Sequence, residues 1–269
     1  MIDQPWPIRA RAWLRRRALV HRHEVALRPA GPKLLAAFAE AHPRAAFVEI
    51  GANDGEQHDL LRPHILAREW RGVMVEPVPY VFERLRRNYQ GIDRVSLENA
   101  AIADRDATAT FYHLAEADEL AREHLPGWYD GIGSFSRDVV VGHATKITDL
   151  HERLVQREVP TLTFATLCER HGLDRVDLLL IDAEGYDREL LRHIDLAAAG
   201  VRLLVYEHFH LSPTARVECR QLVAAAGFET MEEGFDTFCL RATVADSVSS
   251  RWRDLRPAIP AVYVEQEPG

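Results

Sequence analysis

Residues 46–55 read AFVEIGANDG, a short apolar run that ends in a glycine-rich turn. The apolar run has the composition of a buried strand, and glycines in such a turn let the backbone approach a ligand closely. A helical segment follows at 60–69, and GVMVEP at 72–77 repeats the buried-strand pattern. Strands and helices that alternate with short connections are typical of a parallel, doubly wound α/β sheet.

The same alternation continues along most of the chain. It pauses between 113 and 159, where we expect a long, partly helical insertion that contains GWYDGIGSF at 127–135. Two strand-like runs at 227–242 meet at Glu233–Gly234, too close for a crossover helix, so they should pair as an antiparallel hairpin. The remaining expected elements are helices at 32–41, 79–90, 162–171, 188–193 and 214–226, and strands at 95–102, 176–185 and 201–209.

We expect one domain from 31 to 245, which includes the insertion at 113–159, and a proline-containing tail at 246–269 that wraps the surface. Residues 1–30 carry seven arginines against Asp3 and Glu24, a net charge near +5, which leaves about −13 for the rest of a chain whose total is −8. This segment has the pattern of an amphipathic helix with its arginines in water. The alternatives are a surface for an acidic partner or a cover over a pocket.

Composition excludes several classes of protein. The 269 residues are 47% hydrophobic, but no apolar stretch approaches the roughly 18 residues of a membrane span. Three cysteines without a CxxC pair indicate a reducing compartment rather than a disulfide scaffold, and the acidic balance disfavours nucleic-acid binding. We therefore expect a cytoplasmic protein with neither a nucleic-acid nor a membrane partner; its oligomeric state is open, a homodimer included.

The first two predicted strands end in residues suited to an adenosine-containing ligand. Glu49, Gly51, Asn53 and Gly55 lie where the first strand passes into a helix, whose start offers free N–H groups. Glu76 follows Gly55 by 21 residues and ends the second strand, where an acidic side chain accepts both ribose hydroxyls. The alternatives are an ordinary tight turn and an exposed carboxylate.

The next strand ends offer further ligand contacts. Asn99, Ala100 and Ala101 end the third strand, where small residues beside an amide suit a purine ring, although a plain buried strand end fits equally well. Asp182, Glu184 and Asp187 follow the fourth strand, and Glu207, His208 and His210 follow the fifth. Carboxylates and histidines on neighbouring strand ends hold a divalent cation or act as a general base. Glu184 and Asp187 have a simpler role as caps of the following helix.

The insertion contributes Ser134, Phe135 and His143 near a pair of glycines. These residues suit a lid over a small-molecule site. His143 is either a base in that site or a surface residue.

Taken together, six motifs resemble the FkbM-type S-adenosylmethionine-dependent methyltransferases, over about residues 46–240. In chain order they are FVEIGANDG, VEPVPYVFERLRRN, LENAAIAD, GIGSF, VDLLLIDAEGYD and VYEHFHL. The resemblance implies a class I methyltransferase fold, with a mostly parallel seven-stranded sheet that ends in an antiparallel hairpin. It implies O-methylation of a hydroxyl on a natural product or a sugar.

The resemblance also implies roles for particular residues. Glu76 would hold the ribose, Asn99 and Ala100 would lie by the adenine, and Ser134 and Asp182 would lie near the methionine end and the acceptor. Asn53 stands where many class I enzymes carry glycine. The loop on the methionine side of the cofactor would consist of Glu49, Gly51, Asn53, Asp54 and Gly55.

A hydroxyl is a poor nucleophile until its proton is removed, so a base or a metal ion must reach it. The predicted base is His208 or His143. Asp182 would orient the acceptor or, with Glu207 and His208, hold a cation such as Mg²⁺. Two other functions remain open: an NAD-dependent oxidoreductase, which the missing GxGxxG and the terminal hairpin disfavour, and a non-catalytic protein that binds a partner through its arginine-rich start.

Overall fold

The computed structural model of the protein describes residues 30–241 and 246–255. The predicted basic helix lies outside these residues apart from Ala30, and so does the predicted tail beyond Leu255. No helix in the described ranges combines the length and the apolar character that a bilayer span requires.

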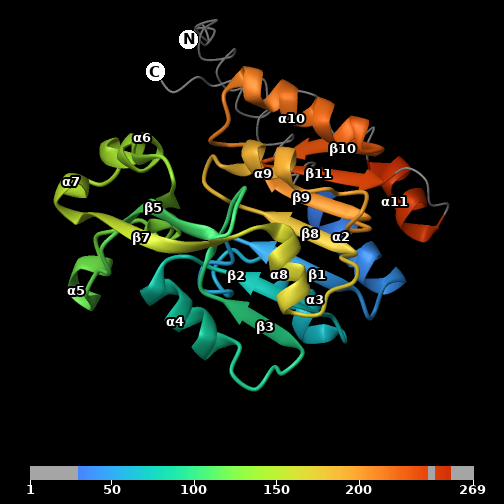
Figure 1. Ribbon diagram of the computed structural model, residues 1–269, viewed down its shortest axis with the longest axis horizontal. Helices are drawn as coiled ribbons and strands as arrows, with labels where there is room; N and C mark the ends of the chain where they lie inside the picture. The colour runs from blue at the N-terminus through green and yellow to red at the C-terminus, as the bar shows by residue number, and fades with distance from the viewer. Residues whose placement is uncertain (1–29, 242–245, 256–269) are drawn as a thin grey trace, which may run out of the picture.

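A seven-stranded sheet forms the centre of the molecule, in the order β10-β11-β9-β8-β1-β2-β3 (Figure 1). Neighbours from β9 to β3 pair in parallel, whereas β11 is antiparallel to both β9 and β10. The predicted parallel sheet and terminal hairpin are therefore confirmed. The strands are β1 (Ala46–Ile50), β2 (Arg71–Val75), β3 (Val95–Glu98), β8 (Leu178–Ile181), β9 (Leu203–Glu207), β10 (Phe228–Glu233) and β11 (Asp236–Arg241).

Helices cover both faces of this sheet because successive strand side chains point to opposite sides. Val48 and Leu179 contribute to one core, and their neighbours Phe47 and Leu178 contribute to the other. The first core lies under α8 (Phe164–Arg170), α9 (Asp187–His193) and α10 (Pro213–Ala225). The second lies under α2 (Ala30–Ala41), α3 (Arg62–Ala67), α4 (Pro79–Asn88) and α11 (Ser247–Leu255).

Helix α11 falls in the segment that we expected to be a surface tail. Its Val248 and Trp252 side chains are buried in the second core, and Trp252 Nε1 donates a hydrogen bond to Glu229 Oε2 at 2.8 Å. Arg202 and Asp246 form an ion pair of 2.6 Å near its start. The first ten residues of the predicted tail thus include a helix that is part of the folded body.

The insertion is built on a second sheet rather than on helices alone. Its order is β4-β7-β5-β6, and the long pair β5–β7 is antiparallel (Figure 1). The strands are β4 (Ala101–Ile102), β5 (Ala107–Leu114), β6 (Gly133–Ser134) and β7 (Leu154–Leu162). Between them lie α5 (Glu119–Arg122), η1 (Tyr129–Gly131), α6 (Arg137–Val141), η2 (Gly142–Thr145) and α7 (Leu150–Arg153).

The second sheet also corrects the predicted third strand at 95–102. The chain leaves the main sheet after Glu98 and pairs with β7 from Ala101 onward. Asn99 and Ala100 therefore form the crossing between the two sheets. This crossing brings the insertion to the carboxyl ends of the parallel strands, where ligands bind in open α/β sheets.

Candidate functional site

A pocket lies at the carboxyl ends of the parallel strands; the empty space in it, including the solvent at its open mouth, is about 640 Å³. The main sheet supplies Ile50, Val75 and Asp182 to its wall, and the insertion supplies Asp130 and Phe135. The other lining residues are Gly51, Asn53, Glu76, Pro77, Val78, Ala100, Ala101, Ile102, Phe111, Gly131, Gly133, Ala183 and Glu184.

The turn after β1 reaches the pocket because it takes a conformation that most residues avoid. Gly51 has φ +82°, and a Cβ there would collide with the backbone carbonyl of Asp182. Asn53 has φ +50°, a left-handed conformation that asparagine tolerates better than most side chains. The backbone nitrogens of Gly51 and Ala52 donate to Val75 O at 2.9 and 3.0 Å. The turn is thus fixed against the end of β2.

Glu76 is the buried carboxylate at the end of β2. Its Oε2 accepts a hydrogen bond from the Asn53 backbone nitrogen at 3.1 Å, and its Oε1 accepts one from Val78 N at 2.7 Å. Burial raises the pKa of Glu76 to about 7, although these two hydrogen bonds act in the opposite direction. The carboxylate is therefore held in one orientation at the pocket wall.

Three predicted cofactor residues have structural positions instead. Asn99 Nδ2 donates to Glu76 O at 2.8 Å, so its amide supports the turn after β2, and Ala100 lines the pocket in its place. Asp54 Oδ1 accepts from the backbone nitrogens of Glu56 and Gln57, both at 2.9 Å. Gly55 packs against Leu85 and Tyr89.

Glu49 and Asp182 lie close together, but only Asp182 lines the pocket. Burial raises the pKa of Glu49 well above its usual range, and the charges of Asp59 and Asp182 add to this effect. The pKa of Asp182 is also raised well above its usual range, first by burial and then by neighbouring carboxylates such as Glu184. The predicted methionine-side loop therefore contributes Gly51 and Asn53 to the pocket wall, and Glu49 lies behind it.

The turn after β8 places Glu184 at the pocket in a left-handed conformation, with φ +47°. Asp187 is completely buried and accepts hydrogen bonds from the backbone nitrogens of Ala183 and Gly185 at 3.4 and 3.2 Å. Ser134 does not line the pocket; its Oγ donates to Glu184 O at 2.8 Å and so ties the insertion to this turn. Asp187 thus fixes the turn before α9 rather than capping that helix as expected, since the N-cap is Tyr186 and has no side-chain hydrogen bond, while Glu184 faces the site.

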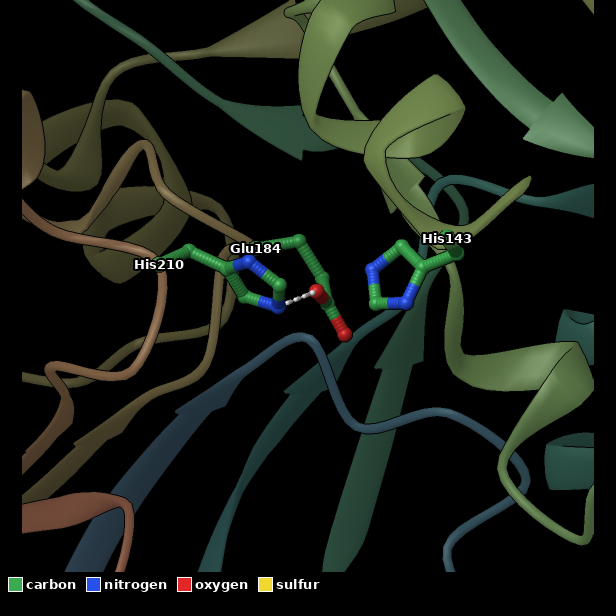
Figure 2. A group of neighbouring side chains, drawn as sticks. All are labelled: His143, Glu184 and His210. Carbon is green, nitrogen blue, oxygen red and sulfur yellow. Dashed lines mark ion pairs between the residues drawn. The ribbon is translucent and has the colours of Figure 1, made fainter. Parts of the chain in front are cut away.

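Glu184 lies between the imidazole rings of His143 and His210 (Figure 2). Its Oε2 forms an ion pair with His210 Nε2 at 2.8 Å, and the two rings have centroids 5.3 Å apart. Burial, and then the nearby His210, lower the pKa of His143 below its usual value. We call these three residues the HEH cluster.

His208, predicted as the base, is not at this site. Its side chain is 3% exposed, and its Nδ1 lies 2.9 Å from Thr237 Oγ1 under the terminal hairpin. Burial lowers the pKa of His208 to about 4. The predicted metal ligands Asp182, Glu207 and His208 therefore do not converge; within the described ranges, the HEH cluster is the group of three or more potential metal ligands that does.

Sequence reasoning predicted His208 as the base and missed the role of His210, two positions after it. Strand β9 ends at Glu207, so strand alternation no longer decides which of the two histidines reaches Glu184. The HFH spacing at 208–210 was the available signal, but it does not distinguish the two rings.

The insertion is anchored beside the pocket by Asp130, another residue that sequence reasoning missed. Arg84 on α4 and Arg122 on α5 form ion pairs with Asp130 at 2.6 and 2.8 Å. Tyr80 OH donates to Asp130 Oδ1 at 3.1 Å. These contacts join the pocket wall of the insertion to α4 of the main domain.

Residues 49–230 match the family model for the methyltransferase FkbM domain. No protein with curated annotation is similar to the chain in sequence. Among solved structures, a methyltransferase FkbM from Methylobacillus flagellatus KT is 10% identical, with a TM-score of 0.46. The match covers 73% of the present chain but only 44% of the Methylobacillus protein. A Geobacter sulfurreducens methyltransferase is 14% identical with a TM-score of 0.42, covering 88% and 98% of the two chains.

The sheet order and the terminal hairpin define a class I, Rossmann-like methyltransferase fold. Because the family model covers more than half of the sequence, the chain belongs to the FkbM methyltransferase family, whose members depend on S-adenosylmethionine. This membership favours the methyltransferase interpretation over the NAD-dependent oxidoreductase.

The side chains that line the pocket have the chemistry that binding of S-adenosylmethionine requires. Glu76 is a fixed carboxylate at the second strand end, the position at which related sheets bind a ribose. Val78, Ala101, Ile102 and Phe111 provide an apolar surface for a purine. Asp182 and Glu184 place two carboxyl groups close to the turn after β1, and a sulfonium or ammonium group bound beside Asp182 would favour its charged form.

Proposed function

We propose that this protein transfers a methyl group from S-adenosylmethionine to a hydroxyl of a small molecule. The observation that carries the proposal is the position of the HEH cluster, whose Glu184 also lines the cofactor pocket. The cofactor supplies a methyl group on a positively charged sulfur. Gly51, Asn53, Glu76 and Ala100 would hold it, and Asp182 and Glu184 would stabilise its charge.

Methyl transfer from a sulfonium is an in-line displacement, so much of the rate depends on holding the acceptor oxygen, the methyl carbon and the sulfur in one line. The acceptor O–H must also lose its proton. We assign this activation to the HEH cluster, which retains His143 from the sequence prediction and replaces His208 with His210. The oxygen would then bond to the methyl carbon as the carbon–sulfur bond breaks and leaves its electron pair on sulfur.

The surroundings of the HEH cluster support a flat or apolar acceptor. Trp128, Phe209 and Phe235 are 40%, 49% and 61% exposed, which is unusual for aromatic side chains. Trp128 contacts the His143 ring, Phe209 contacts the His210 ring, and Phe235 contacts Phe209, with centroids 5.3, 4.8 and 4.6 Å apart. An aromatic rim of this kind suits a natural product, or the apolar face of a sugar ring.

Two measurements test the proposal. Calorimetric titration with S-adenosylhomocysteine should show one-site binding, and NAD as the control ligand should show none. Methyl transfer to a panel of phenols, aliphatic alcohols and sugars, measured at saturating S-adenosylmethionine, should then be lost in Glu184→Gln. Glu189→Gln on α9, a carboxylate outside the pocket, is the matched control. Absence of S-adenosylhomocysteine binding in folded protein, or transfer only to nitrogen or carbon acceptors, would refute the proposal.

A further inference from the structure

The HEH cluster brings together three segments that are distant in the sequence. His143 lies on η2 of the insertion, Glu184 lies in the turn after β8, and His210 follows β9. Each offers one potential ligand atom, and these atoms all lie within 4.8 Å of one another. Figure 2 shows the Glu184 carboxylate between the two rings, with His143 approaching from the side opposite His210.

One nitrogen of the HEH cluster lacks a protein partner. His143 Nε2 is buried and makes no hydrogen bond to any described residue. Buried polar atoms in proteins are nearly always paired, so an exception of this kind requires an explanation. Its closest ring neighbours, Trp128 and His210, leave it facing the Glu184 side of the cluster. A cation held between the rings would provide the missing partner.

The backbone around Glu184 is built to hold that carboxylate in place. A non-glycine residue with φ +47° costs about 1–3 kcal/mol and persists only where its surroundings fix it. Ser134 Oγ binds Glu184 O, and Asp187 binds the next backbone nitrogen, of Gly185, at 3.2 Å. Such outer contacts are what orient the ligands of a metal site.

We infer that His143, Glu184 and His210 bind a divalent metal ion such as zinc. Two imidazole nitrogens and one carboxylate oxygen suit Zn²⁺, Fe²⁺ or Co²⁺, whereas Mg²⁺ prefers oxygen ligands alone. Tetrahedral bonds of about 2.0–2.1 Å place ligand atoms roughly 3.3 Å apart. The ligand atoms lie within 4.8 Å of one another, so their separations must shorten by up to about 1.5 Å, which side-chain rotation supplies.

Three protein ligands leave the fourth position of the ion open for another oxygen. The role of the ion rests on the proposed function. The acceptor hydroxyl would occupy the open position and lose its proton to solvent water, because the positive charge of the ion stabilises the resulting alkoxide. That oxygen bonds to the methyl carbon as the carbon–sulfur bond breaks onto sulfur. The ion thereby performs the activation that the HEH cluster was assigned above.

Metal binding can be measured without methyl transfer. The tag-free, chelator-treated full chain is titrated with ZnCl₂ by calorimetry and with CoCl₂ by absorption spectroscopy, which detects tetrahedral nitrogen–oxygen coordination directly. We expect one ion per chain, and a loss of at least about 100-fold in affinity in His143→Ala, Glu184→Gln and His210→Ala. His171→Ala is the matched control, because His171 forms a similar ion pair with Glu98, at 2.9 Å, outside the HEH cluster. Circular dichroism establishes that each variant is folded.

The possible outcomes separate the two proposals. One-site binding that all three variants lose and His171→Ala retains supports the metal site, whether or not a methyl acceptor is found. No stoichiometric binding to folded wild-type protein, or unchanged affinity in His143→Ala, overturns the metal site. In that case methyl transfer that still depends on Glu184 would leave the proposed function intact, with His143 or His210 as the base.

Discussion

The backbone nitrogen of Asn53 donates a hydrogen bond to Glu76 Oε2 across 3.1 Å, which joins the turn after β1 to the end of β2. Both residues line the pocket. The turn and the carboxylate are thus positioned before any ligand arrives, which reduces the entropy that binding must overcome.

Replacement of Glu76 by alanine should weaken S-adenosylhomocysteine binding about 10- to 100-fold. A hydrogen bond to a charged group contributes about 1.5–3 kcal/mol, and the backbone nitrogens of Asn53 and Val78 also lose their acceptor. Calorimetric titration measures the effect. Glu98→Ala is the control, since Glu98 also ends a strand but pairs with Arg170 and His171 away from the pocket. Equal affinities in the two variants would contradict a ribose-binding role for Glu76.

The pKa of Glu76 predicts how stability depends on pH. Burial raises this pKa from 4.5 to about 7, so between these values the carboxyl ionises in the unfolded chain but stays protonated in the folded one. Folding stability contributed by Glu76 should therefore fall as pH rises from 4.5 to about 7, by at most about 3 kcal/mol, and stay constant above.

Urea unfolding of ligand-free protein at several pH values tests this expectation. Glu76→Gln should flatten the slope over this range, although Asp187, whose pKa is also raised to about 7 by burial, keeps part of it. Parallel pH profiles for Glu76→Gln and wild type would show that Glu76 titrates normally in the folded state.

The two histidines after β9 should respond differently to replacement by alanine. His208→Ala leaves a cavity and removes the partner of Thr237 Oγ1, so it should lower the free energy of unfolding by about 2–3 kcal/mol without a selective loss of turnover. His210→Ala should lower kcat about 100-fold or more and spare S-adenosylhomocysteine binding. Unfolding curves, calorimetry and kcat for both variants decide the matter. The reverse pattern would return the activating role to His208.

Replacement of Glu184 by glycine should raise the stability of the protein and remove its activity. Glu184→Gly relieves the left-handed backbone and should raise the free energy of unfolding by about 1 kcal/mol, yet abolish methyl transfer. Glu184→Ala also removes the carboxylate but keeps the strained φ, so the difference in stability between the two variants isolates the backbone effect. A glycine variant no more stable than the alanine variant would indicate that the turn stores no strain.

The sequence by itself determined the parallel sheet, the terminal hairpin and the cofactor half of the site. Apolar runs such as 178–181 show no alternation with polar residues, so both faces of the strand must be buried, as they are in the centre of a parallel sheet. The carboxyl ends of parallel strands also meet at one edge of a sheet, so Gly51, Glu76 and Asp182 had to lie together. These features depend on local pattern and on a general rule of topology.

Only the tertiary structure decided the acceptor half. The pairing of β5 with β7 spans the whole insertion, and weak alternation in 107–114 gave little sign of it. That pairing carries His143 toward His210, and the end of β9 at Glu207 turns His208 away. Contacts between segments remote in the chain fix loop conformations, because no local periodicity constrains side chains beyond the end of a strand.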